Sequence, residues 1–292
     1  MYQIETVSKG LVAHGVSTCH GCGLEFVIRT VVEELGPRTI IVIPPGCSAV
    51  FSGCSYETAL KIPGFQGNLE NTAAYAAGIS RGLRVQGIED VHVLGFAGDG
   101  ATVDIGLQAL SGAMERNENI IYVCYDNEAY MNTGIQGSGS TSYHAWTTTT
   151  PAGKKGMPKD MMMIAKAHKI PYAASASVGY LDDLKRKVKK AKNVKGMAYL
   201  HVCAPCPTGW GYKPEDTVKI AKLAVDTGAW ALYEIEDGKV HITKNVANRK
   251  PIEEYLKIQK RFRGMSDDDI RYLGEQVAKN CDELERLEKL YQ

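Results

Sequence analysis

Residues 98–136 read GDGATVDIGLQALSGAMERNENIIYVCYDNEAYMNTGIQ, and they are the best starting point for inferring the fold. They follow the apolar run VHVLGF at residues 91–96, which predicts a buried strand. After the two glycines, apolar residues recur at helical spacing, and residues 119–125 predict a second strand. This order of elements is typical of an α/β fold with a parallel sheet. The residues on the apolar face of the predicted helix are Val103, Leu107, Leu110 and Met114.

Polar residues follow both predicted strands, with Asp99 after the first and Asn127 after the second. Because the carboxyl ends of parallel strands meet at one edge of a sheet, where open α/β sheets bind ligands, we expect the two side chains to lie close together. Their oxygens are hard donors, suited to Mg²⁺ bound together with phosphate. A lone Gly-Asp-Gly is more often a simple turn, but the order of the surrounding elements favours a metal–phosphate site.

The composition is that of an ordinary globular protein. The chain has 292 residues, of which 44% are hydrophobic and 23% charged, with a net charge of +1. This charge creates no general attraction for nucleic acid or an anionic membrane. The first ten residues lack the apolar core of a signal peptide, and no apolar run approaches the roughly 20 residues of a membrane helix. We therefore expect a cytoplasmic protein with neither nucleic-acid nor membrane partners.

Eight cysteines, in a sequence without a recognisable secretory signal, favour metal or redox chemistry over disulfides. Two pairs have the CxxC spacing. Cys19 and Cys22 precede a predicted helix, whereas Cys203 and Cys206 follow a predicted strand. By spacing alone the two pairs could bind zinc through four thiolates, and an iron–sulfur cluster is an equally good interpretation.

Cys47 distinguishes these interpretations, because a two-pair zinc site would leave it without a role. It follows a predicted strand at residues 39–43, which places it on the same edge of the sheet as Asp99. Cys54 is interpreted as a small apolar filler.

The predicted sheet pattern is interrupted by residues 137–156, GSGSTSYHAWTTTTPAGKKG, which have no apolar period. A loop of this length in a compact domain is usually functional or disordered. The expectation is an ordered loop over the site or at a subunit contact, with a mobile surface loop as the alternative. Further on, residues 180–192 predict an amphipathic helix with a basic, solvated face.

The composition changes near residue 229. We predict one α/β domain over residues 1–228 and an arm for subunit contact over residues 229–292. The arm is predicted to consist of a hairpin followed by helices at 251–261 and 267–290. The hairpin is expected to turn at Asp237 and Gly238, and Ser266 is expected to cap the last helix, with Asp269 three residues on.

The residues around Asp99 resemble a known family. The GDG motif, with Asn127 twenty-eight positions after Asp99, resembles the thiamine diphosphate-binding motif. The continuation NEAYMNTGIQ at residues 127–136 resembles the β subunit of multi-subunit 2-oxoacid:ferredoxin oxidoreductases, specifically the archaeal-type, pyruvate-acting branch. The resemblance extends from residue 19 to residue 212. It implies a doubly wound, mostly parallel sheet with a C-terminal hairpin and helical arm.

For the cofactor site, the resemblance implies that Mg²⁺ binds the side chains of Asp99 and Asn127 and the carbonyl of Ala129. Diphosphate and water would complete the octahedral coordination. Gly98 and Gly100 are expected to let the main chain approach the diphosphate.

Three further residues are expected at the cofactor. Gly46 and Cys47 would line its site, and Asn132 would lie near the reactive end. A single [4Fe–4S] cluster is also implied, with the second CxxC pair contributing the cysteine that follows a proline. The cluster ligands implied are Cys19, Cys22, Cys47 and Cys206.

The activity implied is the reversible conversion of pyruvate, coenzyme A and oxidised ferredoxin to acetyl-CoA, CO₂ and reduced ferredoxin. The partners would be the α-, γ- and δ-type subunits and, through the complex, ferredoxin. One of these subunits would supply the glutamate that activates the cofactor, so we expect this chain to be inactive alone. The alternatives are a non-oxidative 2-oxoacid decarboxylase half with structural zinc, an oxidoreductase for oxalate or 2-oxobutyrate, and a non-catalytic zinc-stabilised scaffold.

Overall fold

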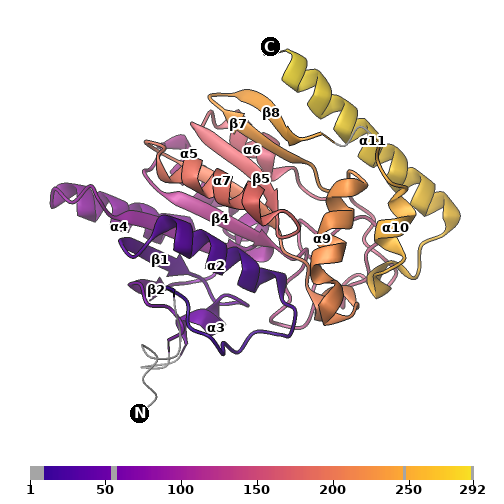
Figure 1. Cartoon of the computed structure of the whole chain (residues 1–292), viewed down its shortest axis with the longest axis horizontal. Helices are drawn as coiled ribbons and strands as arrows, with labels where there is room; N and C mark the ends of the chain where they lie inside the picture. Colours follow the sequence, from indigo (N-terminus) through magenta and orange to yellow (C-terminus); the bar gives the residue numbers. More distant parts are fainter. Residues whose placement is uncertain (1–9, 54–57, 246–247, 291–292) are drawn as a thin grey trace.

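The computed structural model describes residues 10–53, 58–245 and 248–290, and these fold around an eight-stranded sheet with the order β2-β1-β3-β4-β6-β5-β7-β8 (Figure 1). The strands from β2 to β5 in this order are parallel, and β7 and β8 add an antiparallel hairpin at one end. The strands are β1 (Thr39–Ile43), β2 (Gly64–Gln66), β3 (His92–Gly98), β4 (Ile121–Asp126), β5 (Tyr172–Ser177), β6 (Ala198–Cys203), β7 (Leu232–Glu236) and β8 (Lys239–Lys244).

Helices cover both faces of this sheet. They are α2 (Gly23–Leu35), α3 (Ala49–Ser52), α4 (Thr72–Val85), α5 (Leu107–Glu115), α6 (Met161–Ala167), α7 (Leu181–Lys192), α8 (Pro207–Trp210), α9 (Thr217–Asp226), α10 (Ile252–Leu256) and α11 (Asp267–Lys289). Three short turns complete the list: a π-helical turn η1 (Gly100–Asp104) and 3₁₀ turns η2 (Pro214–Asp216) and η3 (Lys260–Phe262).

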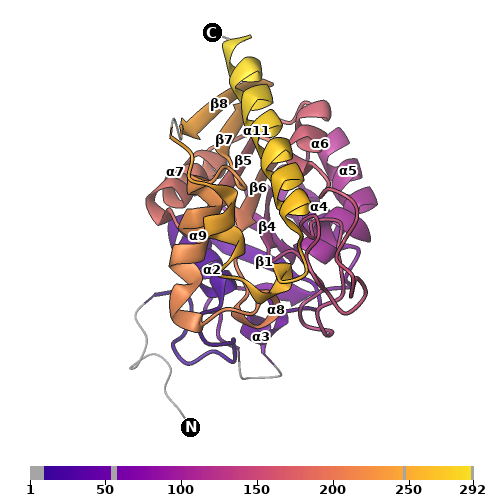
Figure 2. The ribbon, with the colours of Figure 1, turned by 90° about the vertical axis from the view of Figure 1, so that its right-hand side faces the viewer.

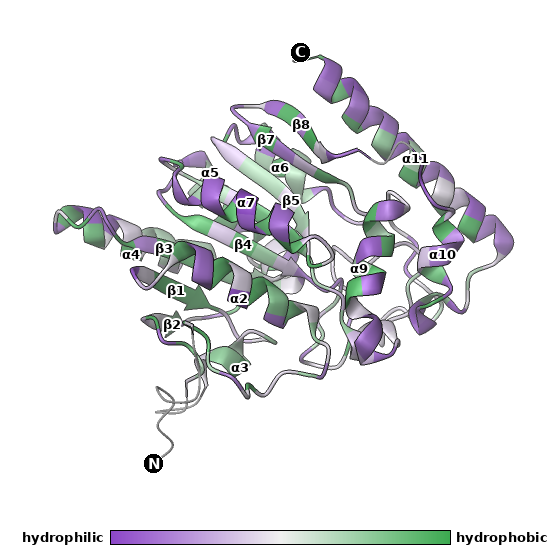
Figure 3. Cartoon of the chain, viewed as in Figure 1, coloured by the Kyte–Doolittle hydropathy of each residue, from purple (hydrophilic) through white to green (hydrophobic). Residues whose placement is uncertain are grey.

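Strand alternation divides the core into two layers. Ile41 faces the layer with α2 and α7, whereas its neighbour Val42 faces the layer with α4, α5 and α6. Figure 2 shows these helices on opposite sides of the sheet. In Figure 3 the central strands are largely hydrophobic, whereas the outward faces of α7 and α11 are hydrophilic. The predicted doubly wound, mostly parallel α/β fold is confirmed.

The C-terminal segment packs on the sheet and on the loops at its carboxyl edge. Its hairpin pairs with β5, and the capping box of Ser266 and Asp269 begins α11 as predicted. The predicted helix at 251–261 is wrong in its length, because the chain forms α10 and then the turn η3. The division of the chain after residue 228 stays a prediction.

The basic helix differs from its prediction at one position. Lys187 is fully buried, and its ammonium group donates hydrogen bonds to the carboxylate of Asp183, the carbonyl of Ser175 and the hydroxyl of Thr243. Its solvation was wrongly predicted because two of these partners, Ser175 of β5 and Thr243 of β8, come from other parts of the fold. Helix α9 and strand β2 were not predicted at all.

The sequence also predicted the absence of a membrane helix and a cytoplasmic location. No helix in the described ranges is both long and apolar enough to cross a membrane. The cytoplasmic location stays a prediction, and Cys54 lies outside the residues that the structure describes.

Candidate cofactor site

The carboxyl ends of four adjacent parallel strands bring the predicted site residues to one edge of the sheet. Cys47 lies beyond β1, Asp99 beyond β3, Asn127 beyond β4 and Cys206 beyond β6. Three of the connections between these strands run through helices, so residues far apart in the sequence become neighbours. This is the edge at which open parallel sheets bind ligands.

Asp99 is buried at the end of β3, where the chain turns into the π-helical turn η1. π-helical turns are rare and occur frequently at functional sites. Its neighbouring glycines are required by tyrosine packing: a Cβ at Gly100 would lie 2.4 Å from the ring of Tyr130, and one at Gly98 would lie 3.1 Å from the ring of Tyr125. The glycines were predicted to make room for a ligand, whereas the contacts with these two rings were not predicted.

Three polar groups converge beside Asp99. One side-chain amide atom of Asn127 lies 2.8 Å from the carbonyl oxygen of Ala129 and 3.1 Å from Oδ1 of Asp99. With its nitrogen toward these two oxygens, the Asn127 amide donates a hydrogen bond to each of them. If the amide is turned by 180°, its own oxygen takes the place of the nitrogen, and three oxygens then face one another. Adjacent oxygens of an octahedral Mg²⁺ site, with metal–oxygen distances of about 2.1 Å, are about 3.0 Å apart. The two distances from the Asn127 amide therefore match the edges of a magnesium octahedron.

The electrostatics of Asp99 also suit a cation. Burial raises the pKa of this carboxyl well above its ordinary value, and the nearby Asp126 and Glu128 carboxylates raise it further. A hydrogen bond from Ser138 acts in the opposite direction. A divalent cation would stabilise the ionised carboxylate and offset most of the free energy that its ionisation costs in this buried position.

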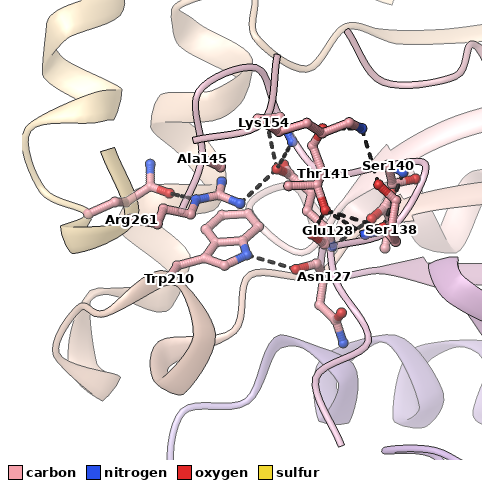
Figure 4. Close-up of polar contacts among 12 residues, drawn as sticks. Asn127, Glu128, Ser138, Ser140, Thr141, Ala145, Lys154, Trp210 and Arg261 are labelled. Carbon is pink, nitrogen blue, oxygen red and sulfur yellow. Dashed lines mark hydrogen bonds and ion pairs between the residues drawn. The ribbon is translucent and has the colours of Figure 1, made fainter. Parts of the chain in front are cut away.

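The loop at residues 137–156 lies against Asp99. Ser138 donates a hydrogen bond of 2.5 Å to Oδ2 of Asp99. Lys154 holds the same turn from the other side, donating to the carbonyls of Ser138, Gly139 and Thr141 (Figure 4). The loop is thus ordered by its own hydrogen bonds.

A cavity of about 130 Å³ opens over these groups. Asn132, which was predicted near the reactive end of the cofactor, lines it together with Gly46, whose φ of 142° favours glycine. The other predicted residues in its wall are Cys47, Gly98, Asp99, Gly100, Asn127 and Ala129. The structure thus brings every predicted cofactor residue to one cavity.

The four predicted cluster cysteines lie on the same edge of the sheet, where the main-chain N–H of Gly23 bonds to the carbonyl of Pro205. Burial raises the pKa of Cys47 to about 12, and the negative charges of Cys206, Cys22 and Cys19 add to this effect. Asp99 contributes to the same shift, and Cys47 and Asp99 line the same cavity. Among the described residues, no three His, Cys, Asp or Glu side chains are grouped closely enough to bind a metal ion.

Cys203 occupies a different environment from Cys206. Along the sheet it lies between Asp126 of β4 and Ser177 of β5, with which it is in register. Burial and the charges of Glu128 and Asp126 raise its pKa. Cys206 instead begins α8, accepting a hydrogen bond from the main chain of Gly209. The two thiols of this CxxC pair therefore have different partners.

Three residues behind the site were not identified from the sequence. Glu128 bonds to Arg261, and Trp210 donates its indole N–H to the carbonyl of Asn127 (Figure 4). Arg261 is 133 positions away from Glu128, and no local pattern could have paired them. The only feature of the sequence that pointed to such a residue was the acidic side chain directly after Asn127.

Several known proteins are similar in sequence to this chain. Residues 45–202 match the thiamine pyrophosphate enzyme family, C-terminal TPP-binding domain. A pyruvate synthase subunit PorB from Methanothermobacter thermautotrophicus is 50% identical over 277 residues, covering 93% of this chain and 96% of the relative. A ketoisovalerate oxidoreductase subunit VorB from Pyrococcus abyssi is 45% identical over 291 residues, covering 95% and 93%.

A similar solved structure is a 2-oxoglutarate:ferredoxin oxidoreductase from Magnetococcus marinus. It has a TM-score of 0.60 and 23% identity, and the match covers 68% of this chain and 67% of that one. At this identity the match supports the fold.

Proposed function

Since this chain belongs to the family of thiamine diphosphate-dependent 2-oxoacid:ferredoxin oxidoreductase β subunits, we propose that it is the cofactor-binding subunit of a pyruvate:ferredoxin oxidoreductase. The complex would convert pyruvate, coenzyme A and oxidised ferredoxin to acetyl-CoA, CO₂ and reduced ferredoxin, reversibly. The observation that carries the proposal is the convergence of Asp99, Asn127 and Ala129 on one point at the sheet edge.

Binding of the diphosphate would depend on Mg²⁺ at this point. The Asp99 carboxylate supplies charge, and Asn127 and Ala129 supply two neutral oxygens. These would leave half of an octahedron for diphosphate oxygens and water, a ligand set that Mg²⁺ favours. Bound thiamine diphosphate supplies the nucleophilic carbon and the electron sink for decarboxylation. The residues of this chain bind and orient it.

The thiols provide an outlet for electrons beside that cofactor. Cys19, Cys22, Cys47 and Cys206 are proposed as ligands of one [4Fe–4S] cluster, because Cys47 follows β1 at this edge and a hydrogen bond from Gly23 to the carbonyl of Pro205 holds the two CxxC segments together. Cys203, which a two-pair zinc site would require, is instead the last residue of β6, in register with Asp126 and Ser177. Cys47 lines the same cavity as Asp99, which supports a short path from the cofactor to the cluster.

Other subunits would complete the site. Pockets for cofactors usually have volumes of about 300–1,000 Å³, whereas the cavity here has about 130 Å³. The wall supplied by this chain is therefore best explained as part of a site shared with an α-type subunit, with γ- and δ-type subunits and ferredoxin as further partners.

Ketoisovalerate is the second candidate substrate. Relatives named for ketoisovalerate are 43–45% identical to this chain, and relatives named for pyruvate are 43–50% identical. Among these relatives the highest identity is to those named for pyruvate, which favours pyruvate as the substrate, but the difference in identity is small. A branched 2-oxoacid differs in the apolar volume that it needs, and one methylene in an apolar pocket changes specificity by about 10–200-fold.

The direct experiment purifies the complex anaerobically through a tag on this chain. Pyruvate, ketoisovalerate and 2-oxoglutarate are compared by the rate of coenzyme A-dependent ferredoxin reduction. We expect pyruvate to have the highest kcat/KM, and the isolated chain to be inactive. Full activity of the chain alone would contradict the subunit proposal, and a preference for ketoisovalerate would contradict the substrate. Asp99→Asn in the same complex should abolish activity, which a scaffold role would not require.

A further inference from the structure

Glu128 has an unusual main-chain conformation next to the proposed magnesium ligands. Its φ is 62°, in the left-handed region that residues other than glycine rarely adopt. The residue is also buried, with 5% of its surface exposed. Such a conformation costs on the order of 1–3 kcal/mol and persists only where the surroundings enforce it. The neighbours of Glu128 must therefore hold it in place.

Arg261 is the strongest of these neighbours. It lies in η3 of the C-terminal segment, is 4% exposed, and donates a hydrogen bond of 2.7 Å to the carboxylate of Glu128. Its other donors bond to Gln259 and to the hydroxyl of Tyr255. Its guanidinium carbon also lies 3.6 Å from the ring centroid of Trp210. Each nitrogen of this cation thus has a specific hydrogen-bond acceptor, and the group lies over the ring of Trp210.

Trp210 connects this cation to the main chain of the site. Its indole N–H donates a hydrogen bond of 2.7 Å to the carbonyl of Asn127. Arg261 therefore acts at two adjacent residues, on the side chain of Glu128 directly and on the main chain of Asn127 through Trp210 (Figure 4).

The loop above the site bonds to the same turn. Ser142 donates to the Glu128 carboxylate, and Thr141 donates to its carbonyl. Thr141 also accepts a hydrogen bond from the main chain of Ser138, whose hydroxyl bonds to Asp99. A continuous chain of contacts thus runs from Arg261 to the proposed metal ligand.

We propose that Arg261 is a positioning residue for the Mg²⁺–thiamine diphosphate site: its contacts with Glu128 and Trp210 hold the turn that presents Asn127 and Ala129 to the metal. The inference rests on the function proposed above. It also assigns a role to the C-terminal segment, which contributes Arg261 and so supports the cofactor site from the side opposite the cavity. A small shift of this turn would move two of the three metal ligands together.

The test uses the assembled complex stripped of its cofactor. The affinity for thiamine diphosphate is measured by equilibrium dialysis at several Mg²⁺ concentrations, with the iron content and melting temperature measured in parallel. For Arg261→Met we expect the Kd for thiamine diphosphate to rise at least tenfold at low Mg²⁺. The difference in Kd between this variant and the wild type should shrink as the Mg²⁺ concentration is raised. Arg261→Lys, which keeps the charge but not the planar fork, should lie between it and the wild type. The iron content should not change.

Lys187→Met is the matched control, because Lys187 is an equally buried cation with an acidic partner. We expect this variant to lower the melting temperature while leaving the Kd within twofold of the wild type. If both methionine variants lose affinity in proportion to their loss of stability, Arg261 has only a structural role. Should Arg261→Met fail to assemble, Arg261→Lys decides the question: an unchanged Kd would overturn the inference. A wild-type complex that binds no thiamine diphosphate would instead overturn the proposed function.

Discussion

The hydroxyl of Ser138 lies 2.5 Å from Oδ2 of Asp99 and donates a hydrogen bond to it, although the two residues are 39 positions apart. The other oxygen of the same carboxylate faces Asn127. Asp99 is therefore oriented by a loop residue on one side and directed at the proposed metal position on the other. Metal ligands are commonly held in this way by hydrogen bonds from residues behind them.

Removing this hydroxyl should weaken metal binding. Ser138→Ala leaves Oδ2 of Asp99 without its donor, and the loss of such a supporting contact typically lowers metal affinity by about 10–100-fold. We expect the Mg²⁺ concentration needed for half-maximal cofactor binding to rise by about tenfold, as measured by equilibrium dialysis on the complex. Ser140→Ala is the control, because this similarly buried serine reaches Ser138 through its main-chain N–H. Equal effects of both variants would contradict a specific role for the hydroxyl.

Asp99→Asn should separate stability from function. The folded chain raises the pKa of Asp99 through burial, so the ionised carboxylate destabilises the cofactor-free protein. A neutral amide avoids this penalty, and we expect the metal-free variant to be more stable at pH 7 by on the order of 1 kcal/mol, or about 2–4 °C in Tm. Cofactor binding should be lost.

The same shift predicts a pH dependence for the metal-free wild type. A carboxyl group with a raised folded pKa stabilises the fold fully below its unfolded pKa, and this contribution is lost as the pH rises through the folded pKa. The stability difference between Asp99→Asn and the wild type should therefore grow from acidic to neutral pH. Urea unfolding at several pH values measures it, and a constant difference would contradict the assignment to Asp99.

The cysteines can be tested one at a time by iron content and by the visible absorption of an iron–sulfur cluster. We expect Cys47→Ser and Cys206→Ser to lose both signals in anaerobically purified complex, because each removes a thiolate of the proposed ligand set. Cys203→Ser should retain both, since this residue is buried within β6 between Asp126 and Ser177 and is outside the proposed ligand set. Zinc in place of iron, with loss on mutation of Cys203, would support the two-pair zinc site.

Gly100→Ala tests why this glycine is needed. The added Cβ would lie 2.4 Å from the ring of Tyr130, so the ring must move, at a cost of about 1–3 kcal/mol in unfolding free energy. Urea denaturation of the cofactor-free chain measures this cost without any contribution from phosphate binding.

The control is Gly78→Ala in α4. There the added Cβ meets no atom within 4 Å, and the change should stabilise the chain by about 0.5–1 kcal/mol. If Gly100→Ala left the stability of the cofactor-free chain unchanged, the glycine would instead be required only by the ligand.

The sequence by itself determined the fold class and the edge at which the site lies. Apolar periodicity and glycine punctuation act locally, so β3, β4 and α5 could be predicted near their observed positions. Since parallel strands end at a common edge, placing Asp99 and Asn127 after two such strands was enough to bring them together.

Only the tertiary structure decided which distant residues support the site. The burial of Lys187, the bond from Ser138 to Asp99 and the pair formed by Arg261 and Glu128 join segments that are far apart in the sequence. The different surroundings of Cys203 and Cys206 likewise follow from where β6 ends and α8 begins. Such contacts depend on how the completed sheet brings loops together, and no periodicity along the chain encodes them.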